Sequence, residues 1–423
     1  MYFLGIDFGT SGARSCVIDA QGAIVAEDKR DFGTLAEYER ADIWREALWD
    51  LIAALPPAIR SQLSDIAIDG TSGTVFACDA ELVPRHPPLL YNDDRATGEA
   101  GLIARLAPPG HPAAAATSGL AKTLWLKKRF GHTGARIYLN QADWLSNLLT
   151  GQAGFSDYHN ALKMGLDLDT LTWPAWVDHL ADSAYLPTPV APGAVLATVS
   201  RARARFLGIH PGCRVHAGTT DSIAAFLAAG VSRSGDAVTS LGSTLVLKLL
   251  SNTRVESTGH GVYSHWFGAR WLAGGASNAG GAVLRRFFDD RTLAALSETI
   301  DPAVASPLDY LPLPRPGERF PVNDPTLVPR LTPRPSDDAE FLHGLLESLG
   351  RIEARGYGLL AELGATSLHR VETAGGGAQN PAWIRIRQRL LSVPVTRAAH
   401  TEAAYGAALL ARDGVQRFNS FSP

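Results

Sequence analysis

The stretch near the N-terminus constrains the fold of this chain most strongly. Residues 3–14 read FLGIDFGTSGAR, in which an apolar run leads through Asp7 to the small-residue turn Gly9–Gly12, and an extended pattern resumes at Arg14. This order predicts a β-hairpin rather than a strand that enters a helix. Glycines let such a turn approach a ligand closely, and its successive N–H groups form a nest for anionic oxygens. Because Asp7 would repel a phosphate, the pattern also points to Mg²⁺ between them.

Composition narrows the class of protein. The chain has 423 residues, of which 46% are hydrophobic and 19% charged, with a net charge of −3. These values predict two or three packed domains and argue against disorder and nucleic-acid binding. Cys16, Cys78 and Cys213 lie far apart, which excludes a disulfide framework and favours buried thiols in a reducing compartment. With no basic leader before Asp7 and no apolar run of about 20 residues, we expect a soluble, cytoplasmic protein without a membrane partner.

The first part of the chain has the pattern of an α/β domain. A third strand is predicted at Ala23–Glu27, a helix with one apolar face at Arg40–Leu55, and a strand at Ser64–Asp69. The last strand ends in the turn Gly70–Thr74, and strand-like Val75–Cys78 follows. The order β-β-β-α-β predicts an α/β domain whose ligands lie at strand ends.

The middle of the chain reads as helical from Ala113 to Gly151. Trp125 and Trp144 are expected in the core, and Lys122 either as a surface charge or in the lining of a cleft. The preceding cluster Tyr91–Arg95 (YNDDR) is interpreted as a turn with surface charges or as a rim that recognises hydroxyl groups.

Two further turns resemble the first one. Val215–Gly230 reads as a strand, a small-residue turn, and a helix opened by Asp221, which is either a helix cap or a functional carboxylate. Asp236–Leu250 reads as a hairpin around Gly242–Thr244, a faint echo of the N-terminal hairpin. Either hairpin alone has the pattern of an ordinary glycine-rich turn. Two of them, one per half, favour a cleft that holds a polyphosphate, and the absence of GxxxxGK[ST] excludes a Walker loop.

The remaining segments are predicted as a Pro-rich covering loop, three helices and a strand. The glycine triplet Gly375–Gly377 between the strand and the helix that follows it favours contact with a planar or anionic ligand, although a loose connector has the same pattern. The last helix, rich in small residues, is expected to pack closely between domains. In chain order these segments are the loop 301–335, the helix Asp337–Leu363, the strand His369–Thr373, the helix Ala382–Leu391 and the helix Glu402–Arg412.

The ordered series of motifs resembles the FGGY family of carbohydrate kinases. It consists of DFGTSGAR, YNDDR, ADWLSNLLTG, HAGTTDS, SLGST, AGGGAQN and EAAYGAA, and it runs over nearly the whole chain. The resemblance is strongest to the small D-ribulose kinase branch of cyanobacteria and plants. It implies two ribonuclease H-like domains of the actin, Hsp70 and hexokinase superfamily, with ATP, Mg²⁺ and sugar in the cleft between them.

The resemblance also implies a division of the chain and a set of site residues. Residues 1–228 would form a domain with the sugar, Mg²⁺ and catalytic sites, joined by a C-terminal helix 402–421, and residues 229–401 would bind ATP. Asp221 would be the catalytic base and Asp7 the Mg²⁺ ligand. The substrate would contact Asp7, Thr10, Ser72, Asp221 and Ser222, and the nucleotide Gly9, Thr10, Ser11, Gly12, Arg14, Gly242, Ser243, Thr244, Gly376, Gly377, Asn380 and Trp383.

One departure from the family pattern leaves the sugar open. Xylulose and glycerol kinases have a Gln-containing motif where this chain has Gly70–Thr74, so Ser72 is expected to contact the sugar instead. The predicted reaction is phosphorylation of a ketopentose, with D-ribulose first and D-xylulose or another pentulose or pentitol as alternatives. The protein is expected to be a monomer or homodimer. An actin- or Hsp70-like ATPase and a sugar-sensing regulator are competing classes, and the lack of GxSxG and HExxH argues against a serine hydrolase or zinc protease.

Overall fold

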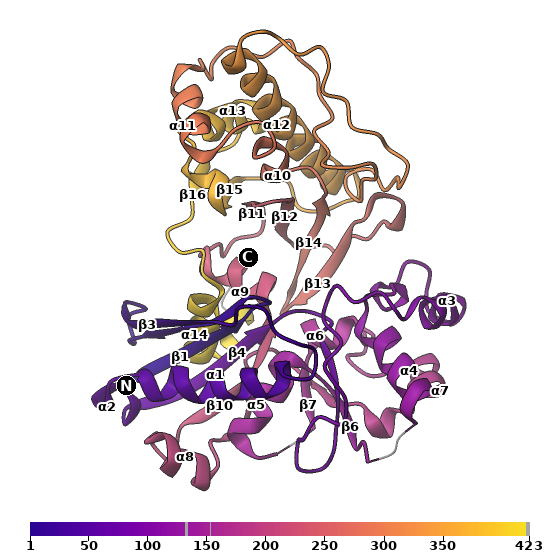
Figure 1. Cartoon of the computed structure of the whole chain (residues 1–423), viewed down its shortest axis with the longest axis vertical. Coiled ribbons are helices and arrows are strands. Elements are labelled where there is room, and N and C mark those ends of the chain that lie inside the picture. The colour runs from indigo at the N-terminus through magenta and orange to yellow at the C-terminus, as the bar shows by residue number, and fades with distance from the viewer. Residues whose placement is uncertain (132–133, 153, 420–423) are drawn as a thin grey trace. The chain divides into compact units, whose positions relative to one another are not determined.

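The computed structural model describes residues 1–131, 134–152 and 154–419. The chain divides into two compact units, of which the first comprises Met1–Ala228 together with the segment from Glu402, and the second comprises Ala229–Thr401 (Figure 1). None of the helices in the described ranges is long and apolar enough to cross a membrane.

Unit 1 is built on a six-stranded sheet in the order β3-β2-β1-β4-β10-β9. β1, β4 and β10 run parallel to one another, and the other neighbours are antiparallel. The strands are β1 (Tyr2–Phe8), β2 (Gly12–Ile18), β3 (Ile24–Asp31), β4 (Leu63–Gly70), β9 (Val195–Thr198) and β10 (Arg214–Thr220), with β5 (Val75–Cys78), β6 (Ile137–Asn140), β7 (Phe155–Asp157) and β8 (Thr188–Val190) in two small sheets. The predicted N-terminal hairpin is confirmed, and the third strand extends beyond Glu27 because it pairs with β2 as far as Asp31.

Helices cover this sheet with apolar side chains. The face of α1 (Arg40–Ala54) predicted to be buried is confirmed, since Trp44, Leu48 and Leu51 belong to the core. The other helices of this unit are α2 (Pro57–Arg60), α3 (Thr97–Leu106), α4 (Gly119–Phe130), α5 (Gln141–Thr150), α6 (Tyr158–Leu162), α7 (Ala175–Ala181), α8 (Arg201–Leu207), α9 (Asp221–Ala228), α14 (Ala403–Asp413) and α15 (Gln416–Asn419).

Several expectations for unit 1 are wrong in detail. The stretch Ala113–Gly151 is not continuously helical, because β6 interrupts it and pairs antiparallel with β5. Trp144 is fully buried as expected, whereas Trp125 is partly exposed and carries the Arg95 guanidinium over its ring. Lys122 is neither at the surface nor in a cleft: its whole side chain is buried.

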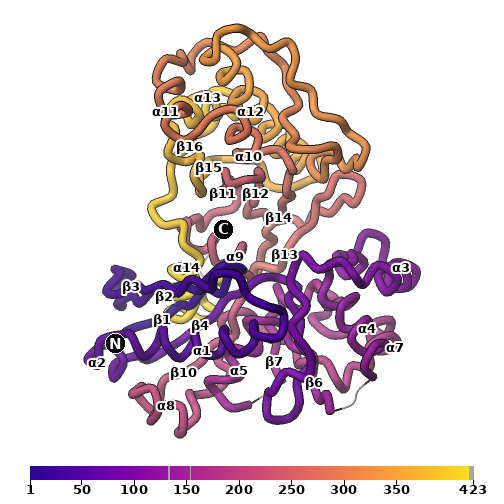
Figure 2. Tube along the Cα trace, viewed as in Figure 1, coloured from indigo at the N-terminus to yellow at the C-terminus, as the bar shows by residue number. Residues whose placement is uncertain are grey.

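The C-terminal segment returns to unit 1. α14 packs on β1, β4 and α9 of unit 1, and its yellow trace runs beside the indigo β1 in Figures 1 and 2. The segment predicted as one helix over 402–421 contains two helices, because Gly414 ends α14 with a positive φ of 57°. Residues 420 and 421 lie outside the described range.

Unit 2 repeats the pattern with a sheet in the order β13-β14-β12-β11-β15-β16. β11 and β12 form the second predicted hairpin, and β15 runs parallel to β11. The strands are β11 (Asp236–Leu241), β12 (Leu245–Ser251), β13 (Tyr263–Phe267), β14 (Arg270–Ser277), β15 (Arg370–Ala374) and β16 (Val395–Arg397), and the helices are α10 (Gly281–Leu284), α11 (Asp290–Thr299), α12 (Asp338–Glu362) and α13 (Pro381–Leu391).

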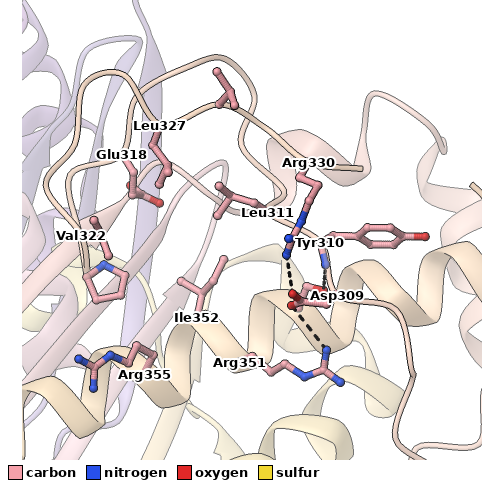
Figure 3. A pocket seen from close by; sticks show the side chains of 13 residues that line it. Asp309, Tyr310, Leu311, Glu318, Val322, Leu327, Arg330, Arg351, Ile352 and Arg355 are labelled. Atoms are coloured by element: carbon pink, nitrogen blue, oxygen red, sulfur yellow. Dashed lines mark hydrogen bonds and ion pairs between the residues drawn. The ribbon is translucent and has the colours of Figure 1, made fainter. Parts of the chain in front are cut away.

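The Pro-rich segment 301–335 is irregular, as predicted, and lies against α12, where Figure 2 shows it as a long orange loop. A hollow of about 530 Å³ opens between this segment and α12. Its floor is apolar, with Leu311 and Ile352, and Arg330 and Arg351 pair with Asp309 at one side (Figure 3).

Candidate functional site

Three aspartates define an acidic edge of the unit 1 sheet. Asp7 lies near the end of β1, Asp69 near the end of β4, and Asp221 starts α9 directly after β10. Because the three strands are parallel neighbours, their carboxyl ends meet at one edge, and Asp7 and Asp69 occupy paired positions. Burial raises the pKa of Asp7, and the charge of Asp221 adds to this, while Asp69 and Arg14 act in the opposite direction.

Asp69 was not among the residues predicted from the sequence. Its side chain is fully buried, and neither carboxyl oxygen has a hydrogen-bond partner in the described structure apart from the neighbouring Asp7 carboxyl. Burial and the charges of Asp7 and Asp221 hold the pKa of Asp69 well above its usual range. A signal for it was present, since residues 6–12 read IDFGTSG and residues 68–73 read IDGTSG. The same strand-end pattern therefore occurs twice within unit 1.

The turn Gly9–Gly12 has free backbone donors beside Asp7. The Gly9 N–H closes the turn on the Gly12 carbonyl at 3.0 Å, whereas no backbone hydrogen bond in the described ranges uses the N–H groups of Thr10 or Ser11, which are exposed. A side chain on Gly12 would meet the Arg30 carbonyl at 2.7 Å, so this position requires glycine. Exposed N–H groups of this kind suit an anionic oxygen.

Arg14 is the cationic group predicted for the same turn. Its guanidinium lies 3.6 Å from Asp7 and 3.6 Å from Glu402, and about half of the side chain is exposed. It is therefore near the acidic edge and accessible to a further anion.

The turn Gly70–Thr74 is held from several sides. Gln141 Oε1 accepts hydrogen bonds from the Thr71 N–H at 3.0 Å and the Thr71 hydroxyl at 2.9 Å. The Thr71 and Thr74 hydroxyls are 2.6 Å apart, and the Gly73 carbonyl accepts a bond from Lys122. The Ser72 hydroxyl makes no hydrogen bond to any described residue. Ser72 thus has a fixed backbone and a donor and acceptor left for a ligand.

Asp221 lies at the start of α9 and is partly buried. One of its carboxylate oxygens accepts a hydrogen bond from the Ser222 N–H at 2.6 Å, and the Ser222 side chain is exposed. The Lys163 side chain, which the sequence did not single out, is partly buried in the same region: burial lowers the pKa of its ammonium, and the charge of Asp221 opposes that effect. Asp221 is thus an accessible carboxylate at the edge of the two buried ones.

Two turns of unit 2 lie at one edge of its sheet. Gly242–Thr244 joins β11 to β12, and Gly375–Gly377 follows β15, the parallel neighbour of β11. Gly375 has a φ of 82° and lies so close to Leu241 that a side chain would meet its carbonyl at 2.7 Å. Arg285, another residue that the sequence did not single out, donates to the Ser243 hydroxyl at 2.9 Å.

Asn380 and Trp383 support the glycine turn from behind. Asn380 caps α13 by accepting a bond from the Trp383 N–H at 3.0 Å, and its amide donates to the Ser297 hydroxyl at 2.8 Å. Trp383 is 2% exposed and packs against Gly377. Gly376 is exposed with open space beside it, so it can approach a ligand through its backbone.

The donor set of unit 1 fits a hard divalent cation. Asp7, Asp69 and Asp221 offer carboxyl oxygens at one edge of the sheet, and the cations of the described structure that act on them include Arg14 and Lys163. Among the described residues no group of three or more His, Cys, Asp or Glu side chains could hold a metal ion, so a cation here would need water and phosphate oxygens as further ligands. Mg²⁺ suits this arrangement because it retains several waters and takes one or two carboxylates together with phosphate oxygens.

Comparison with known proteins matches both halves of the chain. The N-terminal domain model of the FGGY family of carbohydrate kinases matches residues 2–228, and the C-terminal domain model matches residues 237–412. The xylulose kinase of Staphylococcus xylosus is 24% identical and covers 100% of this chain and 92% of its own.

Solved structures agree in fold. A xylulose kinase from Brucella ovis has a TM-score of 0.87 at 21% identity, covering 100% of this chain and 93% of its own. That of Rhodospirillum rubrum has a TM-score of 0.84 at 21% identity, covering 99% and 92%. At this identity the likeness shows the fold alone, which is a two-domain α/β fold. Since the family models match nearly all of it, the chain belongs to the FGGY family of carbohydrate kinases.

Proposed function

We propose that this protein transfers the γ-phosphoryl group of ATP to the terminal hydroxyl of a ketopentose, with D-ribulose as the first choice. The observation that carries the proposal is the accessible Asp221 carboxylate beside two buried carboxyls and a turn with free N–H groups. FGGY kinases use ATP, generally with Mg²⁺.

In the proposed mechanism, Asp221 orients the sugar hydroxyl and accepts its proton. The hydroxyl oxygen forms a bond to the γ-phosphorus, the bond to the β–γ bridging oxygen breaks, and ADP leaves. An aspartate is a weak base, with an ordinary pKa of about 3.9, but the hydroxyl proton is lost late, after attack has acidified it. Positioned proton transfer of this kind contributes about 10²–10⁴ in rate.

Further site residues of unit 1 would neutralise negative charge on the phosphoryl group that is transferred. Asp7 would hold Mg²⁺ through water, and the ion would offset the charge of the phosphate oxygens. The N–H groups of Thr10 and Ser11 and the Arg14 guanidinium would bind equatorial oxygens of the phosphoryl. Ser72, Thr10 and Ser222 would contact the sugar.

Unit 2 would bind the nucleotide. Gly242, Ser243 and Thr244 are proposed for its phosphates, with Arg285 holding the Ser243 hydroxyl, because this hairpin repeats the arrangement of the first. Gly376 and Gly377 are proposed for adenosine, which could lie on the exposed glycine backbone. Asn380 and Trp383 would act by holding that turn rather than by direct contact.

The choice of sugar rests on the Gly70–Thr74 turn. D-ribulose is favoured by the GTSGT sequence with its unpaired Ser72 hydroxyl. D-xylulose is the second candidate, because relatives that span nearly the whole chain are named xylulose kinases.

The test is ADP release with ATP and Mg²⁺ across D-ribulose, D-xylulose, L-ribulose, L-xylulose, ribitol, xylitol and glycerol. We expect the highest kcat/KM with D-ribulose, and Asp221→Asn to lower kcat about 10²–10⁴-fold. Asp42→Asn, in the exposed first turn of α1, is the matched control and should leave kcat unchanged. Preference for D-xylulose would replace the substrate and keep the mechanism, whereas ADP release independent of every sugar would overturn the proposal in favour of a conformational ATPase.

A further inference from the structure

Lys122 is a fully buried cation in the second turn of α4. Its ammonium donates to three backbone carbonyls: that of Gly73 at 2.9 Å, that of Thr117 at 2.9 Å and that of Leu90 at 2.5 Å. The residue has no exposed surface. An ammonium group has three N–H donors, so all of them are used.

The three acceptors come from separate segments of the chain. Gly73 belongs to the turn that contains Ser72, Leu90 directly precedes the exposed cluster Tyr91–Arg95, and Thr117 precedes α4. The turn and the cluster are thus bound to the same nitrogen atom, although Asp93 in the cluster is paired with Arg95 and not with Lys122.

Keeping a cation at this place is costly. Burial lowers the pKa of Lys122 to about 7, Asp93 acts in the opposite direction, and Lys163 adds to the lowering. Burying a lysine that has no contacting carboxylate stabilises the core less than burying an apolar side chain, because the apolar side chain has no charge to desolvate. An apolar side chain has no hydrogen-bond donor, however, and so it could not hold three loop carbonyls at one position.

We propose that Lys122 is a positioning residue for sugar recognition, which holds the Ser72 turn and the Tyr91–Arg95 cluster together as one recognition surface. The inference rests on the proposed function, because it assigns the Ser72 turn to the sugar. It makes Lys122 a determinant of sugar affinity and selectivity without contact between Lys122 and the substrate.

The first test is Lys122→Met, which keeps the length of the side chain and removes the three donors. We expect the KM for the preferred ketopentose to rise about 10- to 100-fold, as for a small misplacement of a binding group, with the KM for ATP within about twofold of the parent. Lys127→Met is the matched control, because Lys127 lies on the same helix and, within the described residues, donates one hydrogen bond of 3.3 Å, to the Leu180 carbonyl. An unchanged sugar KM, or an equal rise in both variants, would overturn the proposal.

Hydrogen exchange provides a readout that does not depend on turnover. Lys122→Met should speed exchange in peptides that cover residues 71–76 and 89–93 more than in the rest of unit 1, and uniform acceleration would contradict the assignment because it reports a general loss of stability. If that variant does not fold, Lys122→Gln keeps two donors and should show a smaller change in the same peptides and the same KM. Should the parent protein phosphorylate no sugar, the proposed function fails, while the exchange result still decides whether Lys122 holds the two segments.

Discussion

Buried charged residues of this protein separate into those with fixed partners and those without. Arg387 is fully buried and donates to both oxygens of Glu353 at 2.5 and 2.7 Å and to the Thr373 hydroxyl at 2.8 Å. Asp69 is equally buried, but the groups of the described structure that act on its carboxyl are the acidic Asp7 and Asp221. A satisfied pair of the first kind stabilises the core, whereas unsatisfied carboxyls at strand ends mark a candidate site.

The Arg387–Glu353 pair gives the first prediction. Arg387→Met should lower the free energy of unfolding by about 3–5 kcal/mol, because it leaves the Glu353 carboxylate buried without its partner. Arg355→Met, which removes an exposed pair with Glu362, should cost about 1 kcal/mol or less. Urea unfolding of both variants measures the difference, and equal losses would show that the buried pair is not held as described.

Asp143 and Asp157 give a prediction on pH. Both are buried and close together, so burial and their mutual repulsion raise the pKa of Asp143. In the unfolded chain the pKa of Asp143 is about 3.9, which is lower than its raised pKa in the folded protein. At a pH between these two pKa values, the folded protein holds a proton on Asp143 that the unfolded chain has lost. Stability from this group is therefore complete below about pH 4 and is lost as the pH rises through the raised folded value.

Asp143→Asn should remove this dependence. The amide oxygen can still accept the hydrogen bond from Asn140, so the fold should be kept. Urea unfolding midpoints measured from pH 5 to pH 9 should fall less steeply for the variant than for the parent. Parallel curves would mean that Asp143 is already ionised in the folded protein.

At the scale of elements, α14 shows how small residues set the position of a helix. Its residues pack so closely that a side chain on Gly5 of β1 would meet the Ala404 carbonyl at 2.1 Å, and one on Gly406 would meet the Ala224 carbonyl of α9 at 1.8 Å. These contacts are with backbone, which cannot move aside without displacing the helix.

Gly406→Ala should therefore destabilise unit 1 by about 3 kcal/mol, at the upper end of the cost of overpacking. Gly101→Ala is the matched control, because Gly101 lies in α3 with open space around it, and alanine there should add about 0.5–1 kcal/mol. Thermal unfolding of the two variants should shift in opposite directions, and a neutral Gly406→Ala would mean that α14 is not seated as closely as described.

Elements with a strong local pattern could be predicted from the sequence. α1, α12 and both hairpins follow from apolar periodicity and small-residue turns. β6 could not, because its four residues IYLN lie between two helices and their partner β5 is some 60 positions earlier in the chain. Its extended form depends on that distant pairing and not on local preference.

The same limit applies to the site. Asp7, Ser72 and Asp221 could be named because each lies in or beside a turn of small residues. Asp69 had a signal in the repeat of IDFGTSG as IDGTSG, but its place beside Asp7 follows only from β4 lying between β1 and β10, and Lys122 becomes notable only once three separate loops meet at its nitrogen. Strand order and loop convergence are properties of the packed chain that periodicity does not express.

At the scale of the whole molecule, the two units share one plan with different consequences. Each sheet has a hairpin, β1-β2 or β11-β12, whose first strand runs parallel to a later strand, β4 or β15. The edge of the first sheet carries carboxylates, whereas that of the second carries glycines and the Arg285–Ser243 pair. Similar folds can thus present different groups at the same edge, which supports the proposal that the first binds sugar and metal and the second binds the nucleotide.

This difference predicts which unit each ligand protects. A ligand slows hydrogen exchange in the parts of a protein that it stabilises on binding. ADP alone should protect peptides that cover Gly242–Thr244 and Gly376–Asn380, and D-ribulose alone should protect those around Ser72 and Asp221. Ser243→Ala should weaken the nucleotide effect and leave the sugar effect intact, whereas Ser72→Ala should do the reverse. Because each unit has its own core, these effects are separable, and nucleotide protection confined to unit 1 would contradict the division of roles between the two sheets.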